Sequence, residues 1–280
     1  MRRMLRITAV WVLAVSCMKN TDFSGFLYSP YDADTRFIQS DSLNKNQPGK
    51  SISISNTSYT FCVGADLHIG GLQNYRTFLQ AINSTSVNFY CLVGDITTGH
   101  KEDYDKLDTF LTFNDTIRHF FTCGNHELYF KGWTSYFRLF GSSTYMATVN
   151  VNGSSDLLIF LDSGNGTLGA KQTTWLEDIL NTYRPMYRHC FVFTHTNLFR
   201  EHNTTSTNFL PEEVYHLLDL FTQHKISMVF MGHDHRHVVE TFGPTTYITL
   251  DAMLDGFNSA SYLECTVDGA KITYKFIPLH

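Results

Sequence analysis

Side chains that can bind metal ions occur at five separate places in the chain, each directly after a short apolar run. They are Asp66 and His68, Asp95, Asn125 with His126 and Glu127, His195, and His233 with His235. In open α/β sheets, the loops that leave the carboxyl ends of the strands converge at one edge, where ligands bind. We therefore expect these side chains to meet at the edge of a sheet.

The residue types are those of a metal centre. Carboxylate, neutral imidazole and amide oxygen together suit Zn, Mn, Fe or a similar cation better than Ca or Mg alone. Seven ligands are too many for one catalytic metal ion but fit two ions that share a carboxylate. Two ions roughly 3.5–4 Å apart can hold both the attacking and the leaving oxygen of a phosphoryl displacement. The predicted ligands are Asp66, His68, Asp95, Asn125, His195, His233 and His235.

The spacing of the ligands indicates how the backbone presents them. The period of two in Asp66-x-His68 and in His233-x-His235 predicts that both side chains of a pair point to the same face of a strand. A glycine directly precedes three of the ligands, where the backbone must turn sharply or approach a neighbour closely. These glycines are Gly94, Gly124 and Gly232.

The elements that position these residues alternate along the chain. The expected strands, continuous apolar runs typical of strands covered on both faces, are Tyr59–Ala65, Asn88–Gly94, His119–Cys123, Asp156–Leu161, His189–Thr194 and Ile226–Met231. The helical patterns between them are Gln73–Ile82, Glu102–Phe113, Ala170–Asn181 and Pro211–Gln223. After Arg236 we expect short strands that end in Ile272–Ile277 and form a second sheet. The pattern predicts one α/β domain.

Composition excludes several classes of protein. With 280 residues, 43% of them hydrophobic and 17% charged, the chain can form an ordinary globular core. The net charge of −5 and the scattered Lys and Arg residues give no basic face, so we predict no specific nucleic-acid partner. The cysteines that lie in apolar runs, together with Cys265, are expected to be buried free thiols rather than a disulfide framework.

The ordered blocks D-x-H, G-D, G-N-H-E, H and G-H-x-H resemble the calcineurin-like metallophosphoesterase superfamily. All five occur in order from Asp66 to His235. The resemblance implies a four-layer α-β-β-α sandwich, in which two facing mixed sheets are flanked by helices. The stretch from Leu161-Asp162-Ser163 to Trp175-Leu176 resembles the small bacterial phosphodiesterase branch, here as an exported, lipoprotein-type member.

Other positions depart from the superfamily pattern. After Gly94-Asp95 the chain reads Ile-Thr-Thr-Gly, without the Arg of protein Ser/Thr phosphatases or the Tyr of purple acid phosphatases. Thr196 stands where many relatives have a Pro after the histidine.

The resemblance also implies a role for each ligand. One metal ion would be bound by Asp66, His68 and His235, and the other by Asn125, His195 and His233. Asp95 would bridge the two ions. Their identity is left open among Mn, Fe and Zn.

His126 corresponds to the superfamily residue that contacts the phosphate and protonates the leaving group. An imidazole with a pKa near ~6.5 can donate a proton at neutral pH. Glu127 either orients this imidazole or caps a helix start. His100, Arg200 and Arg236 could reach the substrate, but an exposed loop histidine and ordinary surface charges are the simpler interpretation.

The implied activity is hydrolysis of a small-molecule phosphoester, with metal-bound hydroxide as nucleophile and His126 as acid. A diester is favoured over a monoester, because no cationic partner for the extra charge of a monoester is obvious. A phosphomonoesterase is the alternative activity. A non-catalytic envelope binding protein with the same fold is the alternative class.

The amino terminus has the pattern of a targeting signal. It begins with Met1-Arg2-Arg3, continues through an apolar stretch, and ends in Leu13-Ala14-Val15-Ser16-Cys17, which resembles a loose bacterial lipoprotein cleavage box. We predict a signal peptide over 1–17, a tether and wrapping segment over 18–55, and a metallophosphoesterase domain over 56–280. The alternation in Ser51–Ser55 predicts an edge strand. The protein would then be exported to a bacterial cell envelope and anchored to a membrane by a lipid on Cys17; a plain signal peptide is the alternative.

Overall fold

The computed structural model describes residues 29–47, 50–114, 116–200 and 207–279. The expected signal peptide and Cys17 lie outside the described residues. Within them, no helix combines the length and the apolar character that crossing a bilayer requires.

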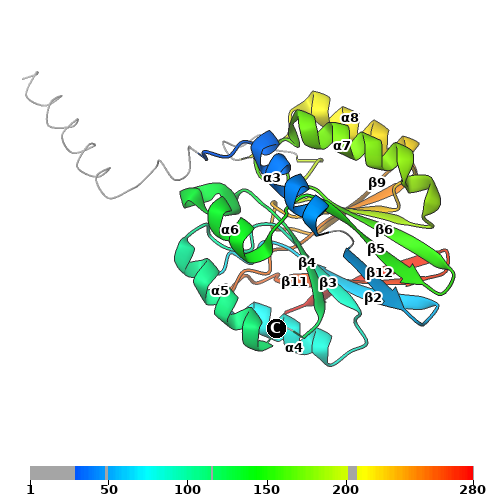
Figure 1. Cartoon of the computed structure of the whole chain (residues 1–280). Helices are drawn as coiled ribbons and strands as arrows, with labels where there is room; N and C mark the ends of the chain where they lie inside the picture. The colour runs from blue at the N-terminus through cyan, green and yellow to red at the C-terminus, as the bar shows by residue number, and fades with distance from the viewer. Residues whose placement is uncertain (1–28, 48–49, 115, 201–206, 280) are drawn as a thin grey trace, which may run out of the picture.

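Two mixed β-sheets form the centre of the domain (Figure 1). In spatial order, the larger sheet contains β1 (Lys50–Ile54), β5 (Tyr145–Val151), β6 (Ser154–Phe160), β7 (Cys190–Phe193), β8 (Met228–Met231), β10 (Thr245–Thr249) and β9 (Val238–Phe242). The smaller sheet contains β12 (Lys271–Pro278), β11 (Ser261–Asp268), β2 (Ser58–Gly64), β3 (Phe89–Val93) and β4 (Arg118–Thr122). The strands that precede the predicted ligands are parallel neighbours. In the smaller sheet β3 lies between β2 and β4, and in the larger sheet β7 lies beside β8.

Helices cover the outer face of each sheet. The helices are α3 (Ala33–Asn46), α4 (Gln73–Asn83), α5 (Lys101–Asn114), α6 (Trp133–Phe140), α7 (Gly169–Thr182) and α8 (Pro211–Gln223), with short 3₁₀ helices η2 (His126–Lys131) and η3 (Arg184–Met186). Apolar residues of α7 and α8 pack on the larger sheet, and those of α4 and α5 pack on the smaller one. The predicted four-layer α-β-β-α sandwich is therefore confirmed (Figure 1).

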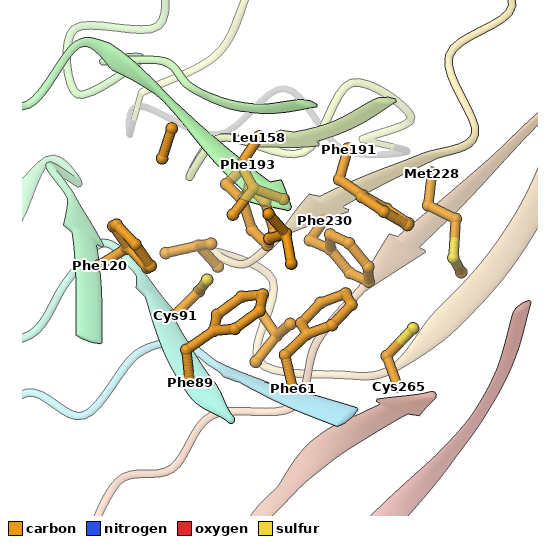
Figure 2. Close-up of a cluster of buried hydrophobic side chains, with 14 of the residues drawn as sticks. Phe61, Phe89, Cys91, Phe120, Leu158, Phe191, Phe193, Met228, Phe230 and Cys265 are labelled. Atoms are coloured by element: carbon orange, nitrogen blue, oxygen red, sulfur yellow. The ribbon is translucent and has the colours of Figure 1, made fainter. Parts of the chain in front are cut away.

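The space between the sheets is filled by phenylalanines. Phe61 and Phe89 of the smaller sheet stack with ring centroids 5.0 Å apart, and Phe230 of the larger sheet meets Phe61 edge-on at 5.8 Å (Figure 2). Burying each such ring stabilises the fold by about 1.5–3 kcal/mol. Alternate residues of β3 serve two cores, since Cys91 faces the other sheet whereas Tyr90 faces the helices. This double burial explains why the strands read as continuous apolar runs.

The strands after Arg236 do not form a sheet of their own, so that expectation was wrong. β10 pairs in parallel with β8 and carries β9 at the edge of the larger sheet. β11 pairs antiparallel with β2 and carries β12 at the edge of the smaller sheet. Without them, β8 and β2 would each expose a row of unpaired backbone groups, and the carboxyl-terminal strands satisfy both rows.

The described part of the expected tether packs on the body of the domain. β1 runs parallel to β5 at the edge of the larger sheet, where alternation predicts an edge strand. Helix α3 was not predicted from the sequence. It begins after Asp32, whose side chain accepts the N–H of Thr35 at 2.7 Å, and it packs against α7. Its buried face includes the charged Arg36 and the polar Ser40, so it shows no apolar stripe.

The described cysteines are all free and buried, as expected. They are Cys62, Cys91, Cys123, Cys190 and Cys265. Burial raises the pKa of each thiol, that of Cys190 to about 12. These thiols are therefore protonated at neutral pH and act as small apolar side chains.

Candidate metal centre

The predicted ligands converge where β2, β3, β4, β7 and β8 end. Three groups of side chains have ligand atoms within 4.8 Å of one another. These groups are Asp66 with His68 and His235, His68 with Asp95 and His126, and Asp95 with His195 and His233. Asp66 and His235, 169 positions apart in the sequence, thus belong to one polar cluster, as expected from the strand-end positions.

One side of the cluster is formed by two histidines around a buried carboxylate. The Nε2 atoms of His68 and His235 are 3.1 Å apart, and they lie 3.7 Å and 3.4 Å from Asp66 Oδ1. Asp66 Oδ1 is fully buried and makes no hydrogen bond with the described residues. Two imidazole nitrogens and an unpaired carboxylate oxygen that face one another fit a cation.

The other side of the cluster surrounds His195 Nε2. This atom lies 3.1 Å from Asn125 Oδ1, 3.2 Å from His233 Nδ1 and 3.3 Å from Asp95 Oδ2. Asp95 Oδ2 is also 3.8 Å from His68 Nε2, on the first side. Asp95 therefore lies between the two groups, at the position predicted for the shared carboxylate.

Backbone carbonyls select the tautomers of two histidines. His195 Nδ1 lies 2.9 Å from Val93 O, and His233 Nε2 lies 2.9 Å from Thr207 O. A carbonyl oxygen can only accept, so these nitrogens carry the protons. The opposite nitrogens, His195 Nε2 and His233 Nδ1, then face the cluster, which is the arrangement found for metal-binding histidines.

Both carboxylates of the cluster are ionised. Burial alone would raise the pKa of Asp95 and Asp66, but the surrounding histidines hold both pKa values below the usual range. Burial likewise acts to lower the pKa of His195, but Asp95 and Asp66 outweigh it and raise this pKa to about 10. Burial lowers the pKa of His68. The result is a pair of buried carboxylates that favours cations, and the protonated His195 is the cation beside them here.

Five of the predicted ligands have a left-handed backbone conformation. Their φ angles are +54° for Asp66, +41° for His68, +48° for Asp95, +76° for His233 and +54° for His235. Non-glycine residues rarely adopt this region, and each instance costs on the order of 1–3 kcal/mol. The predicted same-face geometry within strands was therefore wrong, because both pairs lie beyond the strand ends and reach one site through left-handed turns.

All three preceding glycines are required by close contacts, as expected. Gly94 has a φ of +83°, and a Cβ there would lie 2.6 Å from His195 Nδ1. A Cβ on Gly124 would lie 2.3 Å from Asp95 Oδ1. A Cβ on Gly232 would lie 2.6 Å from Asp66 Oδ2. Any side chain at these positions would push against a ligand.

Glu127 neither contacts the His126 imidazole nor caps its own helix. Its Oε2 accepts the backbone N–H groups of Asp95 and Gly124, both at 2.8 Å, and its Oε1 accepts the N–H of Thr97 at 3.0 Å. Burial and the charge of Asp95 raise the pKa of Glu127 to about 7, whereas these N–H donors lower it. Neither predicted role is found: the carboxylate ties together two ligand-bearing loops.

His126 lies at the open side of the cluster. Its Nε2 is 3.8 Å from Asp95 Oδ2, its side chain is 30% exposed, and its ring centroid is 4.3 Å from that of His68. Burial lowers the pKa of His126 to about 4, against the expected value near ~6.5. The imidazole is thus neutral at pH 7, and a phosphate anion bound beside it would raise its pKa.

The remaining sequence candidates lie around this centre. His100 is exposed and stacks on Phe130 with ring centroids 3.9 Å apart. Arg200 forms a partly buried ion pair with Asp234 at 2.7 Å, which neither interpretation of Arg200 predicted. Arg236 is exposed.

One contributor was missed from the sequence. The Tyr129 hydroxyl accepts Asn125 Nδ2 at 2.9 Å, which leaves Asn125 Oδ1 facing His195. Its position four residues after Asn125 is the one available signal, and it is too common to be specific.

Comparisons with known proteins agree with this geometry. The model of the calcineurin-like phosphoesterase family matches residues 59–237. A search of the curated proteins gives no match.

Solved structures share the fold at low sequence identity. A dimetal phosphatase from Danio rerio is 15% identical with a TM-score of 0.63, covering 79% of this chain and 96% of its own. GAP50, described as the anchor in the inner membrane complex of Plasmodium, is 14% identical with a TM-score of 0.61. The match covers 79% of this chain and 84% of GAP50. A putative 5′-nucleotidase from Staphylococcus aureus is 16% identical with a TM-score of 0.58, covering 79% of this chain and 54% of its own.

Proposed function

Because the chain belongs to the calcineurin-like phosphoesterase family, we propose that it hydrolyses a small-molecule phosphoester at a centre of two divalent metal ions. The observation that carries the proposal is the position of Asp95 Oδ2, 3.3 Å from His195 Nε2 and 3.8 Å from His68 Nε2. One ion is assigned to Asp66, His68 and His235, the other to Asn125, His195 and His233, and Asp95 to both. Manganese, iron and zinc all suit this donor set.

The ions, when bound, would supply Lewis acidity and make hydroxide available near neutral pH. The chain's own residues do the rest. Val93 O and Thr207 O keep the imidazoles of His195 and His233 in fixed tautomers. His126, at the open side, is assigned to protonate the departing alkoxide.

We favour a phosphodiester over a monoester. A monoester carries an extra negative charge that commonly takes a cationic partner. Arg200 follows the ligand His195 by five residues, but its guanidinium is engaged by Asp234, Thr207 O and Asn208 Oδ1. This engagement supports a substrate with a single charge on phosphorus, and the bacterial phosphodiesterase branch is the proposed subfamily.

The test measures bound metal and hydrolysis together. We expect about two ions per chain, and faster hydrolysis of bis-p-nitrophenyl phosphate than of p-nitrophenyl phosphate in Mn²⁺. Asp95→Asn should abolish nearly all activity, whereas Asp41→Asn, the same change on the surface of α3, should not. Activity retained in Asp95→Asn would refute the bridging role, and faster monoester hydrolysis would refute the diester preference.

A non-catalytic surface protein is the competing function. Loss of a ligand would be its signature, and the complete set of seven supports the enzyme instead. A protein that binds no metal and hydrolyses neither substrate would favour the binding role.

We further propose that the protein is exported to a bacterial cell envelope and carries a lipid on Cys17. The sequence of residues 1–17 supports this proposal. The wild type should partition into detergent, and Cys17→Ala should stay in the aqueous phase. Aqueous partitioning of both would refute the lipid anchor.

A further inference from the structure

We infer that helix α3 positions a metal ligand, with Arg36 acting through Asp162 and Ser163 on the backbone at His195. The inference rests on the proposed metal centre and extends it to residues that lie behind the ligands. The two ends of this path are 159 residues apart in the sequence, from 36 to 195.

The path begins with a buried cation. Arg36 on α3 is fully buried, and its guanidinium donates to both carboxylate oxygens of Asp162, at 2.7 Å and 2.9 Å. A third nitrogen donates to Tyr31 O at 2.8 Å and also contacts Asn165 Oδ1. A planar fork on a carboxylate fixes orientation as well as charge, so α3 holds the loop after β6 in one position.

Asp162 is also held by partners outside α3. Its Oδ1 accepts the N–H of Gly164 at 3.1 Å, and its Oδ2 accepts the hydroxyl of Ser143 at 2.8 Å. The side-chain amide of Gln172 on α7 binds the backbone N–H and the carbonyl of Asp162, each at 2.8 Å. Every polar group of Asp162 is therefore engaged, and the following residue has little freedom.

That following residue holds the ligand loop. Ser163 Oγ accepts the N–H of His195 at 3.1 Å and the N–H of Thr196 at 2.9 Å. The hydroxyl of Thr196 donates back to Ser163 O at 2.9 Å. Ser163 and Thr196 are both buried, so these bonds are shielded from water.

The threonine at position 196 has a specific use in this arrangement. A proline there, as the superfamily pattern expects, has no N–H and no hydroxyl. Thr196 supplies both groups, and both bind Ser163. Two bonds from one residue replace the rigidity that the proline ring would give. The imidazole of His195 then needs only the bond from Nδ1 to Val93 O to become fixed.

The test compares Ser163→Ala and Arg36→Lys with wild type. Arg36→Lys keeps the positive charge but loses the planar guanidinium that donates to both carboxylate oxygens of Asp162. The matched control is Thr60→Val, which removes a hydroxyl that bonds Thr266 at 2.9 Å between β2 and β11. Amide hydrogen exchange of residues 194–198 is measured in metal-free protein. Mn²⁺ affinity is measured separately by competition with a chelator.

We expect Ser163→Ala to speed exchange at residues 194–198 and to weaken one of two Mn²⁺ sites about 10–100-fold, as loss of a ligand's support usually does. Arg36→Lys should also speed exchange at residues 194–198 and weaken Mn²⁺ binding. Thr60→Val should change neither the exchange nor the affinity. Unchanged exchange in Ser163→Ala or in Arg36→Lys would overturn the inference, as would faster exchange with unchanged affinity. If wild type binds no Mn²⁺, the proposed function fails, and the exchange comparison alone decides whether α3 orders the loop.

Discussion

The carboxylate of Glu127 is bound to the main chain of Asp95, because Glu127 Oε2 accepts the Asp95 N–H at 2.8 Å. The same oxygen accepts the N–H of Gly124, the residue before Asn125. One buried carboxylate therefore holds two loops that carry ligands. This link places Asp95 and Asn125 at the distance that the centre needs.

Glu127→Gln should reduce both Mn²⁺ affinity and kcat at least about tenfold. A glutamine amide has one accepting oxygen, and its NH₂ group would face N–H donors at the other position. Chelator competition and rate measurements at saturating Mn²⁺ check the two effects. Glu264→Gln, at a half-buried carboxylate that pairs with the exposed Lys275, is the control. Equal behaviour of the two variants would contradict the bracing role of Glu127.

Replacing His126 should affect substrates according to their leaving groups. His126→Ala should slow hydrolysis of a diester with an alkyl leaving group by about 10²–10⁴-fold, because an alkoxide needs a proton to depart. Release of p-nitrophenolate, a much weaker base, should slow less. The measurement is kcat/KM for both kinds of substrate with equal metal loading. An equal fall for both would show that His126 acts in binding rather than as an acid.

Gly124→Ala should impair the centre, because its Cβ would lie 2.3 Å from Asp95 Oδ1. Either Asp95 must move away from its position between the groups or the turn before Asn125 must open. We expect weaker Mn²⁺ binding and loss of most activity. Gly153→Ala, where nothing lies within 4 Å of the new Cβ, should bind metal as wild type does. Full activity in Gly124→Ala would contradict the tight approach of the two loops.

Asp162→Asn should make the free energy of unfolding depend less on pH in the acid range. Burial acts to raise the pKa of Asp162, but Arg36 outweighs it and holds this pKa below its usual range. A carboxyl with a lowered folded-state pKa stabilises the fold above its unfolded pKa of about 3.9, and that contribution is lost as pH falls through the folded value. Urea unfolding between pH 3 and 7 should show a smaller pH dependence in the variant. The variant should also be less stable at pH 7, by about 3–5 kcal/mol, because Arg36 loses its buried partner.

The core strands and the helices with apolar stripes could be predicted from the sequence, because each buries a regular pattern. Helix α8 was predicted as Pro211–Gln223 and has these bounds in the structure. Helix α3 could not be predicted in this way, since its buried Arg36 and Ser40 look like surface residues until Asp162 and Ser143 are placed beside them. Long-range polar pairing leaves no periodic signal.

The set of residues at the centre was predictable, but its local geometry was not. Strand ends and residue types identify Asp66 and His68, yet their left-handed φ angles follow from contacts made elsewhere. One such contact is the bond from His68 N–H to Asp95 O at 2.9 Å. Likewise, nothing near Glu127 in the sequence indicates that it serves Asp95 rather than His126.

The five buried cysteines have a practical consequence for handling the protein. None is paired, and burial keeps each thiol protonated and out of reach of reagents. Folding therefore needs no oxidant and no disulfide exchange, even in an oxidising compartment. Of the six cysteines in the sequence, the remaining one is Cys17. A thiol that reacts with a colorimetric reagent in the native protein must then belong to Cys17, and it reports directly whether that sulfur is free or blocked.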